Sequence, residues 1–397
     1  MSSLNSPDRL IVIGGGIGGV ATALAARRAG HEVTVLEQAS AFTEVGAGLQ
    51  MAPNATRVLR DLGVLDQVIE AGVRPDHLVF HNAVDGKELT RVRLDAAYEE
   101  RFGGPYVVVH RSDLLDILVR ATDEAGVELL TGTRVEDIDQ RPGSVAVRTE
   151  DGTEYTGAAL IAADGLHSRT RALFSDDEPI QSGYVAYRGT IPIEDVKGGE
   201  NLRDVLVWMG PKLHLVQYPL RSGSLYNQVA VFRSPGFDRG AEKWGGPEEM
   251  EEVFAAACEP VRRALPGLGR QRWWPMADRE PISCWTKDRV ALLGDSAHPM
   301  LQYLAQGACQ ALEDAATLAA ASTRHTAADG TVAWPSALEE YAAERAPRTA
   351  RVQSTARVWG EMWHVEGVAA LLRDEVFRNR ASADLSPAAW LWGHRAA

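Results

Sequence analysis

Cysteine is scarce in this chain: Cys258, Cys284 and Cys309 are the only three among 397 residues. No two of them have the C-x-x-C spacing that is typical of zinc ribbons and dithiol redox sites. Three scattered cysteines do not make the disulfide framework of a secreted domain, so their number favours a reducing, cytoplasmic environment.

Long apolar runs are missing as well. Glycine or charge interrupts each hydrophobic stretch before it reaches the roughly 18–20 residues that a membrane helix needs. Residues 1–9 are polar and lack the apolar core of a signal peptide. The sequence therefore predicts neither a transmembrane segment nor export.

Basic residues are outnumbered, with 41 Lys and Arg against 54 Asp and Glu and a net charge of −13. Nucleic-acid binding needs a basic face, so this balance argues against a nucleic-acid partner. No set of His, Cys, Asp and Glu has metal-site spacing, and no Gly-x-Ser-x-Gly nucleophile elbow is present. Neither a bound metal nor a serine nucleophile is expected.

The first informative motif is a glycine-rich turn near the N-terminus. Gly14, Gly16 and Gly19 separate a short β-branched strand from an alanine-rich helix expected over 20–29, and the next strand ends at Glu37. This order is the dinucleotide-binding βαβ fingerprint. Gly14 permits the tight turn, Gly16 lets backbone approach a pyrophosphate, and Gly19 lets helix and strand pack closely. Glu37 accepts hydrogen bonds from a ribose, which suits FAD or NAD better than NADP.

A second segment of this kind runs from Gly294 to Gln310. An apolar strand pattern at 289–293 leads into it, and a helical Ala/Leu pattern at 311–321 leads out. A carboxylate and a Gly-Ala step lie between them. This layout is typical of a cofactor site at the carboxyl end of a strand and the N-terminus of a helix.

Between these segments the hydrophobic pattern changes. Residues 213–218 and 228–232 alternate as antiparallel strands do, and helical periodicity is absent from 183–231. Earlier in the chain, helices are expected to begin behind the N-cap residues Asn54 and Ser112.

These patterns predict an α/β (α+β) protein with a Rossmann-like nucleotide-binding domain, a discontinuous β-sheet substrate domain and a helical C-terminal segment. The expected boundaries are 1–75, 105–178 and 278–335 for the nucleotide-binding domain, 76–104 and 179–277 for the substrate domain, and 336–397 for the C-terminal segment.

Three motifs, taken in chain order, resemble those of the single-component, FAD-dependent aromatic hydroxylases, the para-hydroxybenzoate hydroxylase-like flavoprotein monooxygenases. They are Gly14–Gly19 with Glu37, then Asp164-Gly165-x-x-Ser168-x-x-Arg171, then Gly294-Asp295-Ser296-Ala297-His298-Pro299. The resemblance covers nearly the whole chain. It implies that FAD is bound, with its ADP part at the first motif.

The same resemblance implies further FAD contacts. Arg111 and Asp164 are expected to contact the cofactor, and the motif around Asp164 also touches the route of NAD(P)H. Asp295 is expected to bond the ribityl chain. The backbone of Gly307 and Ala308 is expected to face the flavin pyrimidine edge, where a helix N-terminus stabilises an anion. Gly48, in the second glycine-rich loop at 45–50, is assigned to the cofactor as well.

Other segments are similar to one branch of this family, the 3-hydroxybenzoate 6-hydroxylases: Tyr106, 214–220, 273–276, 300–304 and 390–393. The branch implies that NADH and O2 are co-substrates and that a flavin C4a-hydroperoxide hydroxylates 3-hydroxybenzoate para to its hydroxyl, giving gentisate (2,5-dihydroxybenzoate). It also implies a homodimer. Met300 departs from the GDAAHPP-like form of the third motif and is expected to reshape one pocket wall.

Four side chains are expected to meet the aromatic acid. His214 and Tyr218 lie four residues apart on a predicted strand, so they face one pocket roughly 13 Å apart and do not share one substrate oxygen. We expect His214 to be the base at the phenol, and Tyr218 to position the substrate or relay a proton. Gln302 and Tyr106 are expected to hold its carboxylate and hydroxyl. The ordinary alternatives are a hydrogen-bonded sheet histidine and loop hydrogen bonds.

The other histidines are expected to be structural or exposed: His298 in the turn of the third motif, and His110, His167 and His364 elsewhere. Three other functions remain open. They are a salicylate hydroxylase-like reaction that releases CO2, hydroxylation of a larger phenol, and flavin binding without turnover. No second GxGxxG is present, so NAD(P)H is expected to bind transiently without a Rossmann domain of its own.

Overall fold

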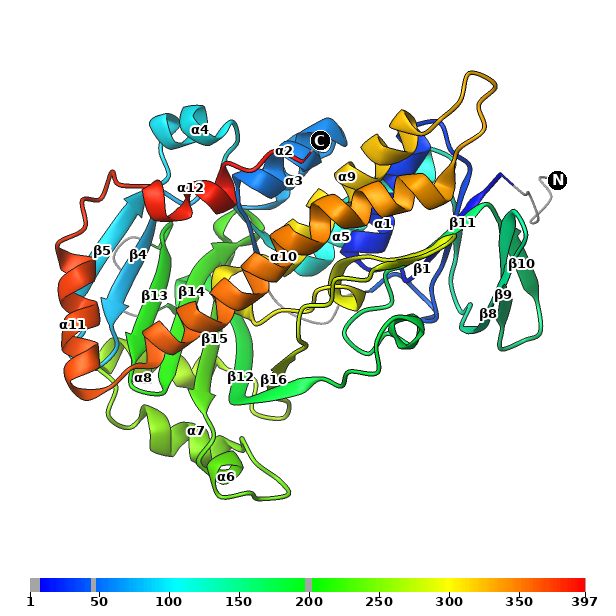
Figure 1. Cartoon of the computed structure of the whole chain (residues 1–397). Helices are drawn as coiled ribbons and strands as arrows, with labels where there is room; N and C mark the ends of the chain where they lie inside the picture. The colour runs from blue at the N-terminus through cyan, green and yellow to red at the C-terminus, as the bar shows by residue number, and fades with distance from the viewer. Residues whose placement is uncertain (1–7, 44–47, 197–201, 397) are drawn as a thin grey trace.

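The structure is a computed structural model that describes residues 8–43, 48–196 and 202–396. Its elements gather around two large sheets (Figure 1). The first sheet has six strands in the order β17-β18-β11-β1-β2-β7, parallel except for the β17–β18 pair. Its strands are β1 (Leu10–Ile13), β2 (Val33–Leu36), β7 (Glu128–Leu130), β11 (Ala159–Ala162), β17 (Thr286–Lys287) and β18 (Val290–Leu292).

Helices cover this sheet because its central strands are apolar on both faces, as in other parallel sheets. The long helix α9 packs on α1, which also packs on α5. Two smaller sheets flank them, β8-β9-β10 and the β3–β6 pair. The elements of this part are α1 (Ile17–Arg28), α2 (Pro53–Asp61), α3 (Leu65–Ala71), α5 (Arg111–Glu124), α9 (Gly307–Arg324), β3 (Gly48–Met51), β6 (Val107–His110), β8 (Val135–Arg141), β9 (Ser144–Thr149) and β10 (Glu154–Gly157).

The second sheet has seven strands in the order β16-β12-β15-β14-β13-β4-β5, antiparallel except for the β4–β13 pair. One face packs on α7 (Pro247–Phe254) and α8 (Glu259–Ala264), which follow the short α6 (Pro235–Asp238). Its strands are β4 (His77–Asn82), β5 (Glu88–Arg93), β12 (Ile180–Pro192), β13 (Val205–Gly210), β14 (Leu213–Leu220), β15 (Leu225–Arg233) and β16 (Trp274–Asp278).

The C-terminal helices tie the two sheets together. The 31-residue helix α10 (Trp334–His364) runs from α9, beside the first sheet, to β13 and β14 of the second (Figure 1). Helix α11 (Gly367–Arg378) lies on β5, and α12 (Ser386–Trp392) lies on α2 near α4 (Ala96–Phe102). No helix in the described ranges is both long and apolar enough to cross a bilayer.

The α/β fold class predicted from the sequence is confirmed, but two predicted helix starts are wrong. Asn54 is not an N-cap: α2 is capped at Ala52 because Pro53 occupies its first position, and Asn54 is buried. At α5 the cap is His110, whose ring accepts a hydrogen bond from the Ser112 N–H. The predicted loop at 45–47 lies outside the described residues.

Candidate active site

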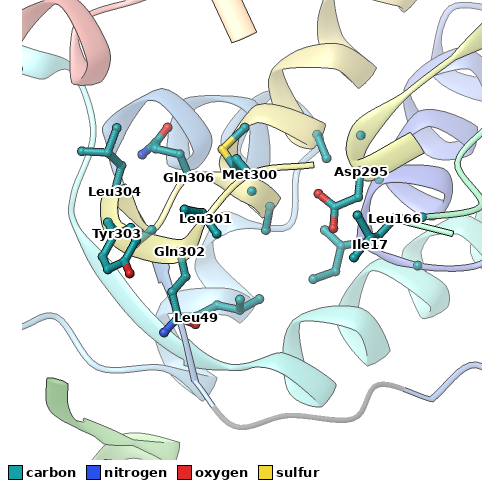
Figure 2. A pocket seen from close by; sticks show the side chains of 18 of the residues that line it. Ile17, Leu49, Leu166, Asp295, Met300, Leu301, Gln302, Tyr303, Leu304 and Gln306 are labelled. Carbon is teal, nitrogen blue, oxygen red and sulfur yellow. The ribbon is translucent and has the colours of Figure 1, made fainter. Parts of the chain in front are cut away.

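A cavity of about 1310 Å³ lies where the strand ends of the first sheet meet one face of the second. Figure 2 looks into it, with Asp295, Ile17 and Leu166 on one side and Gln302 with Leu49 on the other. Of the predicted site residues, all but Gly19 line it: Gly14, Gly16, Glu37, Gly48, Tyr106, Arg111, Asp164, His214, Tyr218, Asp295, Gln302, Gly307 and Ala308. Positions far apart in the sequence thus form one continuous wall.

One end of the cavity has the shape of a dinucleotide cradle. Gly14 has φ +100°, and a Cβ there would lie 2.3 Å from the Ala163 carbonyl oxygen. Gly19 lies behind the turn, where a Cβ would come within 2.0 Å of the Gly14 oxygen. Gly16 caps α1 without a side chain, so the first N–H groups of the helix remain available to a pyrophosphate. The geometry of these glycines leaves room for close backbone approach and packing.

Glu37 closes the far side of this cradle. One of its carboxylate oxygens accepts from the Gly15 N–H at 2.6 Å, and the other accepts from the Ala39 N–H at 2.6 Å. Each oxygen keeps a lone pair, so the carboxylate can still accept from a ribose hydroxyl. Glu37 therefore also fixes the glycine turn, a role that the motif alone did not indicate.

We expect a Gly14→Ala variant to lose most of its bound flavin. The methyl group would meet backbone rather than a movable side chain, in a backbone conformation that alanine rarely adopts. The measurement is the ratio of flavin to protein absorbance after purification. Gly30→Ala is the matched control, since Gly30 has φ +98° but no atom within 4 Å of a new Cβ. Equal flavin loss in both variants would contradict a cradle role for Gly14.

The Asp164 motif is joined to the turn at Gly294–Ser296. Asp164 Oδ2 accepts from the Arg169 N–H, whereas Oδ1 is buried and has no partner among the described residues. Arg171, at the end of the motif, is paired with Asp177 and donates to the carbonyl oxygens of Ser296 (2.9 Å) and Ala297 (2.7 Å). A buried carboxylate oxygen without a partner, on a residue that lines the cavity, fits a cofactor hydroxyl or N–H.

Asp295 lies exposed to the cavity in the short helix η5 (Gly294–Ser296), close to the start of α9. A Cβ on Gly307 would lie 3.9 Å from Asp295 Oδ1, and no side chain caps α9. The first N–H groups of α9 and the positive end of its dipole are therefore free for an anion. His298 lies outside the cavity lining, fully buried and bonded to Asp314 at 2.6 Å.

The second sheet forms the floor of the other end of the cavity. Strand pairing places five side chains in one row across it: Arg188, Val229, Val216, Val207 and Phe80. His214 and Tyr218 lie on either side of Val216 on the same face of β14, as the alternation predicted.

Two tyrosines close the walls beside this floor. Tyr218 packs on Gly48, where a Cβ would come within 2.3 Å of its ring, so Gly48 leaves room for an aromatic side chain. Tyr106 donates from its hydroxyl to Gln50 Oε1 at 2.6 Å. Burial raises the pKa of both hydroxyls, so both remain protonated near neutral pH.

Arg188 is the site residue that the sequence reasoning missed. It lies over the ring of Trp274 at 5.4 Å, and its Nη2 donates to Gln302 Oε1 at 3.3 Å. Its Nε is buried without a partner, and it forms no ion pair with any carboxylate in the described chain. Burial lowers its pKa, but an arginine stays charged. The sequence offered one signal for Arg188: in a strand with period-two alternation it falls on the same face as Ala186. Its partner on the neighbouring strand is Val229.

The tryptophan-rich tail forms another wall. Trp390, Leu391 and Trp392 of α12 line the cavity, and the Trp392 ring lies edge-on to Tyr106 at 6.3 Å. Arg57 holds this helix by donating to the Trp392 carbonyl oxygen at 3.1 Å. The C-terminus is thus part of the site.

A glycine cradle beside a sheet that presents Arg188 and His214 is the arrangement expected of an FAD-dependent aromatic hydroxylase. The chain belongs to the FAD binding domain family, whose model matches residues 9–356. The predicted resemblance and the predicted cofactor, FAD, are therefore confirmed.

The chain is also similar to individual members of this family over nearly its whole length. A 3-hydroxybenzoate 6-hydroxylase of Polaromonas naphthalenivorans (strain CJ2) is 40% identical over 390 residues, which cover 97% of this chain and 95% of that protein. A 3-amino-4-hydroxybenzoate 2-monooxygenase of Streptomyces cremeus is 36% identical and covers 98% of this chain and 95% of that protein. The solved structure of Klebsiella pneumoniae HpxO with FAD and uric acid has a TM-score of 0.82 at 26% identity, covering 94% of this chain and 93% of that one.

Proposed function

We propose that this enzyme hydroxylates 3-hydroxybenzoate para to its hydroxyl, with NADH and O2 as co-substrates, and so forms gentisate. One observation carries the proposal: the cavity places a half-buried cation, Arg188, across the sheet from the imidazole of His214. They are two strands and two residues apart, roughly 12 Å between Cα atoms, so an aromatic acid fits between their side chains. The similarity to 3-hydroxybenzoate 6-hydroxylases over nearly the whole chain supports the same substrate.

Each part of the site has a task in this reaction. FAD held in the glycine cradle would supply, once reduced by NADH, the activation of O2 that oxygen transfer to an electron-rich ring requires. Arg188 and the Gln302 amide hold the substrate carboxylate, and His214 contacts its phenolic oxygen. Tyr106 and Tyr218, both neutral, fix the ring between them, while Asp295 and the N-terminus of α9 hold the flavin. Met300 lines the same cavity and sets part of its width.

Product identity tests the proposal. The purified flavoprotein is incubated with NADH and, in separate reactions, 3-hydroxybenzoate, salicylate, 4-hydroxybenzoate and 3-amino-4-hydroxybenzoate, and products are separated by chromatography. Gentisate from 3-hydroxybenzoate is expected. Catechol and CO2 from salicylate alone would instead identify a decarboxylating enzyme. If no aromatic acid changes the rate at which the flavoprotein oxidises NADH, the protein would be a flavin-binding module without hydroxylation activity. Repeating the reaction with NADPH distinguishes the reductants, and light scattering tests the homodimer that we also propose.

We expect His214→Ala to keep its FAD and to lose about 100-fold or more in hydroxylation rate, since one positioned hydrogen-bond partner of the reacting oxygen is worth about that much. NADH oxidation continues, but its electrons go to hydrogen peroxide, which a peroxidase assay measures. The control is His325→Ala, because His325 pairs with Glu340 away from the cavity. Loss of flavin from His214→Ala would show that His214 supports the cofactor instead.

A further inference from the structure

His214 is hydrogen bonded to a second buried histidine that lies behind the cavity wall. His214 Nδ1 and His364 Nε2 are 2.8 Å apart. The exposed fraction is 1% for His214 and 6% for His364, and only His214 lines the cavity. His364 is the last residue of α10, and its carbonyl oxygen accepts from the Lys212 N–H at 3.1 Å. The end of the helix is therefore fixed to the start of β14, where His214 lies.

The pair is enclosed by aromatic rings. Tyr184 stacks on His364 with centroids 4.4 Å apart, while Tyr303 and the edge of Trp363 lie against His214 at 5.5 Å and 5.1 Å. Neither imidazole bonds to a carboxylate of the described residues. Burial lowers the pKa of His214 well below its usual value, and burial with Arg373 lowers the pKa of His364 to about 3. Both rings are therefore neutral near pH 7.

A count of protons decides which of the two rings donates the hydrogen bond. A neutral imidazole carries one N–H, so one of the two facing nitrogens donates and the other accepts. If His214 donated, His364 would carry its proton on Nδ1, which is buried and has no acceptor in the described part of the chain. Buried N–H groups without an acceptor are rarer than unsatisfied acceptors. Donation from His364 Nε2 to His214 Nδ1 avoids that orphan.

We propose that His364 is a positioning residue that holds His214 in its Nε2–H tautomer, so that His214 presents a hydrogen-bond donor to the phenolic oxygen of the substrate. The idea rests on the proposed function, which supplies that phenol. A donor at this oxygen favours the phenolate, whose ring is the more electron-rich. This role replaces the base expected from the sequence, because two neutral rings without a carboxylate do not keep the substrate's proton.

The tautomer can be measured without a substrate. In the holoenzyme labelled with ¹⁵N-histidine, the expected spectrum has a protonated Nε2 and an unprotonated Nδ1 on His214, assigned by comparison with His364→Gln. A protonated Nδ1 on His214 would overturn the proposal. Because this experiment needs only the folded flavoprotein, its result is independent of whether 3-hydroxybenzoate is the substrate.

Binding then tests the consequence. His364→Leu removes the donor, whereas the amide of His364→Gln supplies another. Loss of support for one charge-assisted hydrogen bond should weaken 3-hydroxybenzoate binding in His364→Leu by about tenfold, with the bound phenol's pKa raised by about one unit. Flavin absorbance changes across a pH series report both. Benzoate, which lacks the phenol, should bind all three proteins alike, and His364→Gln should restore most of the affinity for 3-hydroxybenzoate.

The outcomes separate the two proposals. A His364→Leu protein that retains FAD and binds 3-hydroxybenzoate with the wild-type pH dependence would overturn the role of His364. Wild-type holoenzyme that binds no hydroxybenzoate would overturn the proposed function. The tautomer measurement would then be the test of whether His364 sets the tautomer of His214. If His364→Leu does not fold, the comparison of wild type with His364→Gln and the tautomer measurement retain the test.

Discussion

Arg188→Met is expected to lower kcat/KM for 3-hydroxybenzoate by roughly 30-fold or more, chiefly through KM. Removing one partner of a buried charge pair costs about 2–5 kcal/mol, and each 1.4 kcal/mol is a factor of ten. The substrate carboxylate would otherwise be buried without a counter-charge, since Arg188 is the cation beside Gln302 on the cavity floor. Arg188→Lys keeps the charge but not the planar fork, so an intermediate loss is expected.

The measurement compares two substrates that share the phenol. 3-Hydroxybenzyl alcohol has no carboxylate, so its turnover should fall far less than that of 3-hydroxybenzoate in Arg188→Met. Arg272→Met is the matched control, because Arg272 also lies over Trp274, at 5.3 Å, but is exposed and does not line the cavity. Equal losses for both substrates would mean that Arg188 acts on the flavin or on the fold instead.

Arg345→Met is expected to lower the free energy of unfolding by about 3–5 kcal/mol, because it leaves buried carboxylates without their counter-charge. Arg345 bonds to both Glu313 and Asp314 on α9, and all three side chains are fully buried. Asp314 in turn accepts from the Gly294 N–H and bonds to His298. Flavin retention should therefore fall along with the melting temperature, since the same cluster supports the turn before Asp295.

Thermal unfolding of the holoenzyme measures this effect. The control is Arg324→Met on α9, the helix of Glu313 and Asp314. Arg324 and its partner Glu340 have side chains 44% and 38% exposed, and such surface pairs are worth about 0–1 kcal/mol. An unchanged melting temperature in Arg345→Met would show that the cluster relaxes or takes up water instead of holding its geometry.

The same cluster predicts a pH dependence. Burial alone would raise the pKa of Glu313 and Asp314, but Arg345 with Arg348 lowers the first to about 2, and His298 with Arg345 lowers the second to about 2. A carboxyl whose pKa is depressed by folding stabilises the protein above its unfolded pKa and loses that contribution as the pH falls towards its folded pKa. Stability should therefore decline from about pH 4.5 downwards to about pH 2. In Arg345→Met this acid decline should be smaller, because the folded-state pKa of both carboxyls moves back towards the unfolded value.

Local pattern was sufficient where short-range geometry alone decides the outcome. The turn at Gly14 needs a left-handed glycine, and the side chains of His214 and Tyr218 share a face because strands have a period of two. The helix start at Asn54 was predicted wrongly for the opposite reason, whereas the start at Ser112 was wrong for a local one, since the ring of His110 caps α5. The Asn54 amide is engaged by Gln306 and Glu313 from distant α9, so it is not available to cap its own helix.

By itself the sequence determined the family, the cofactor and the fold class, because these depend on short motifs that can be read along the chain. Only the tertiary structure decided which of the remaining polar residues act in the site. Arg188 reaches the cavity through the pairing of β12 with β15, and His364 reaches His214 across 150 residues. Trp392 comes to Tyr106 through the folding back of the C-terminus. The physical reason is that a buried charge or N–H is defined by the partners that surround it, and these come from strands and helix ends that are adjacent only after folding.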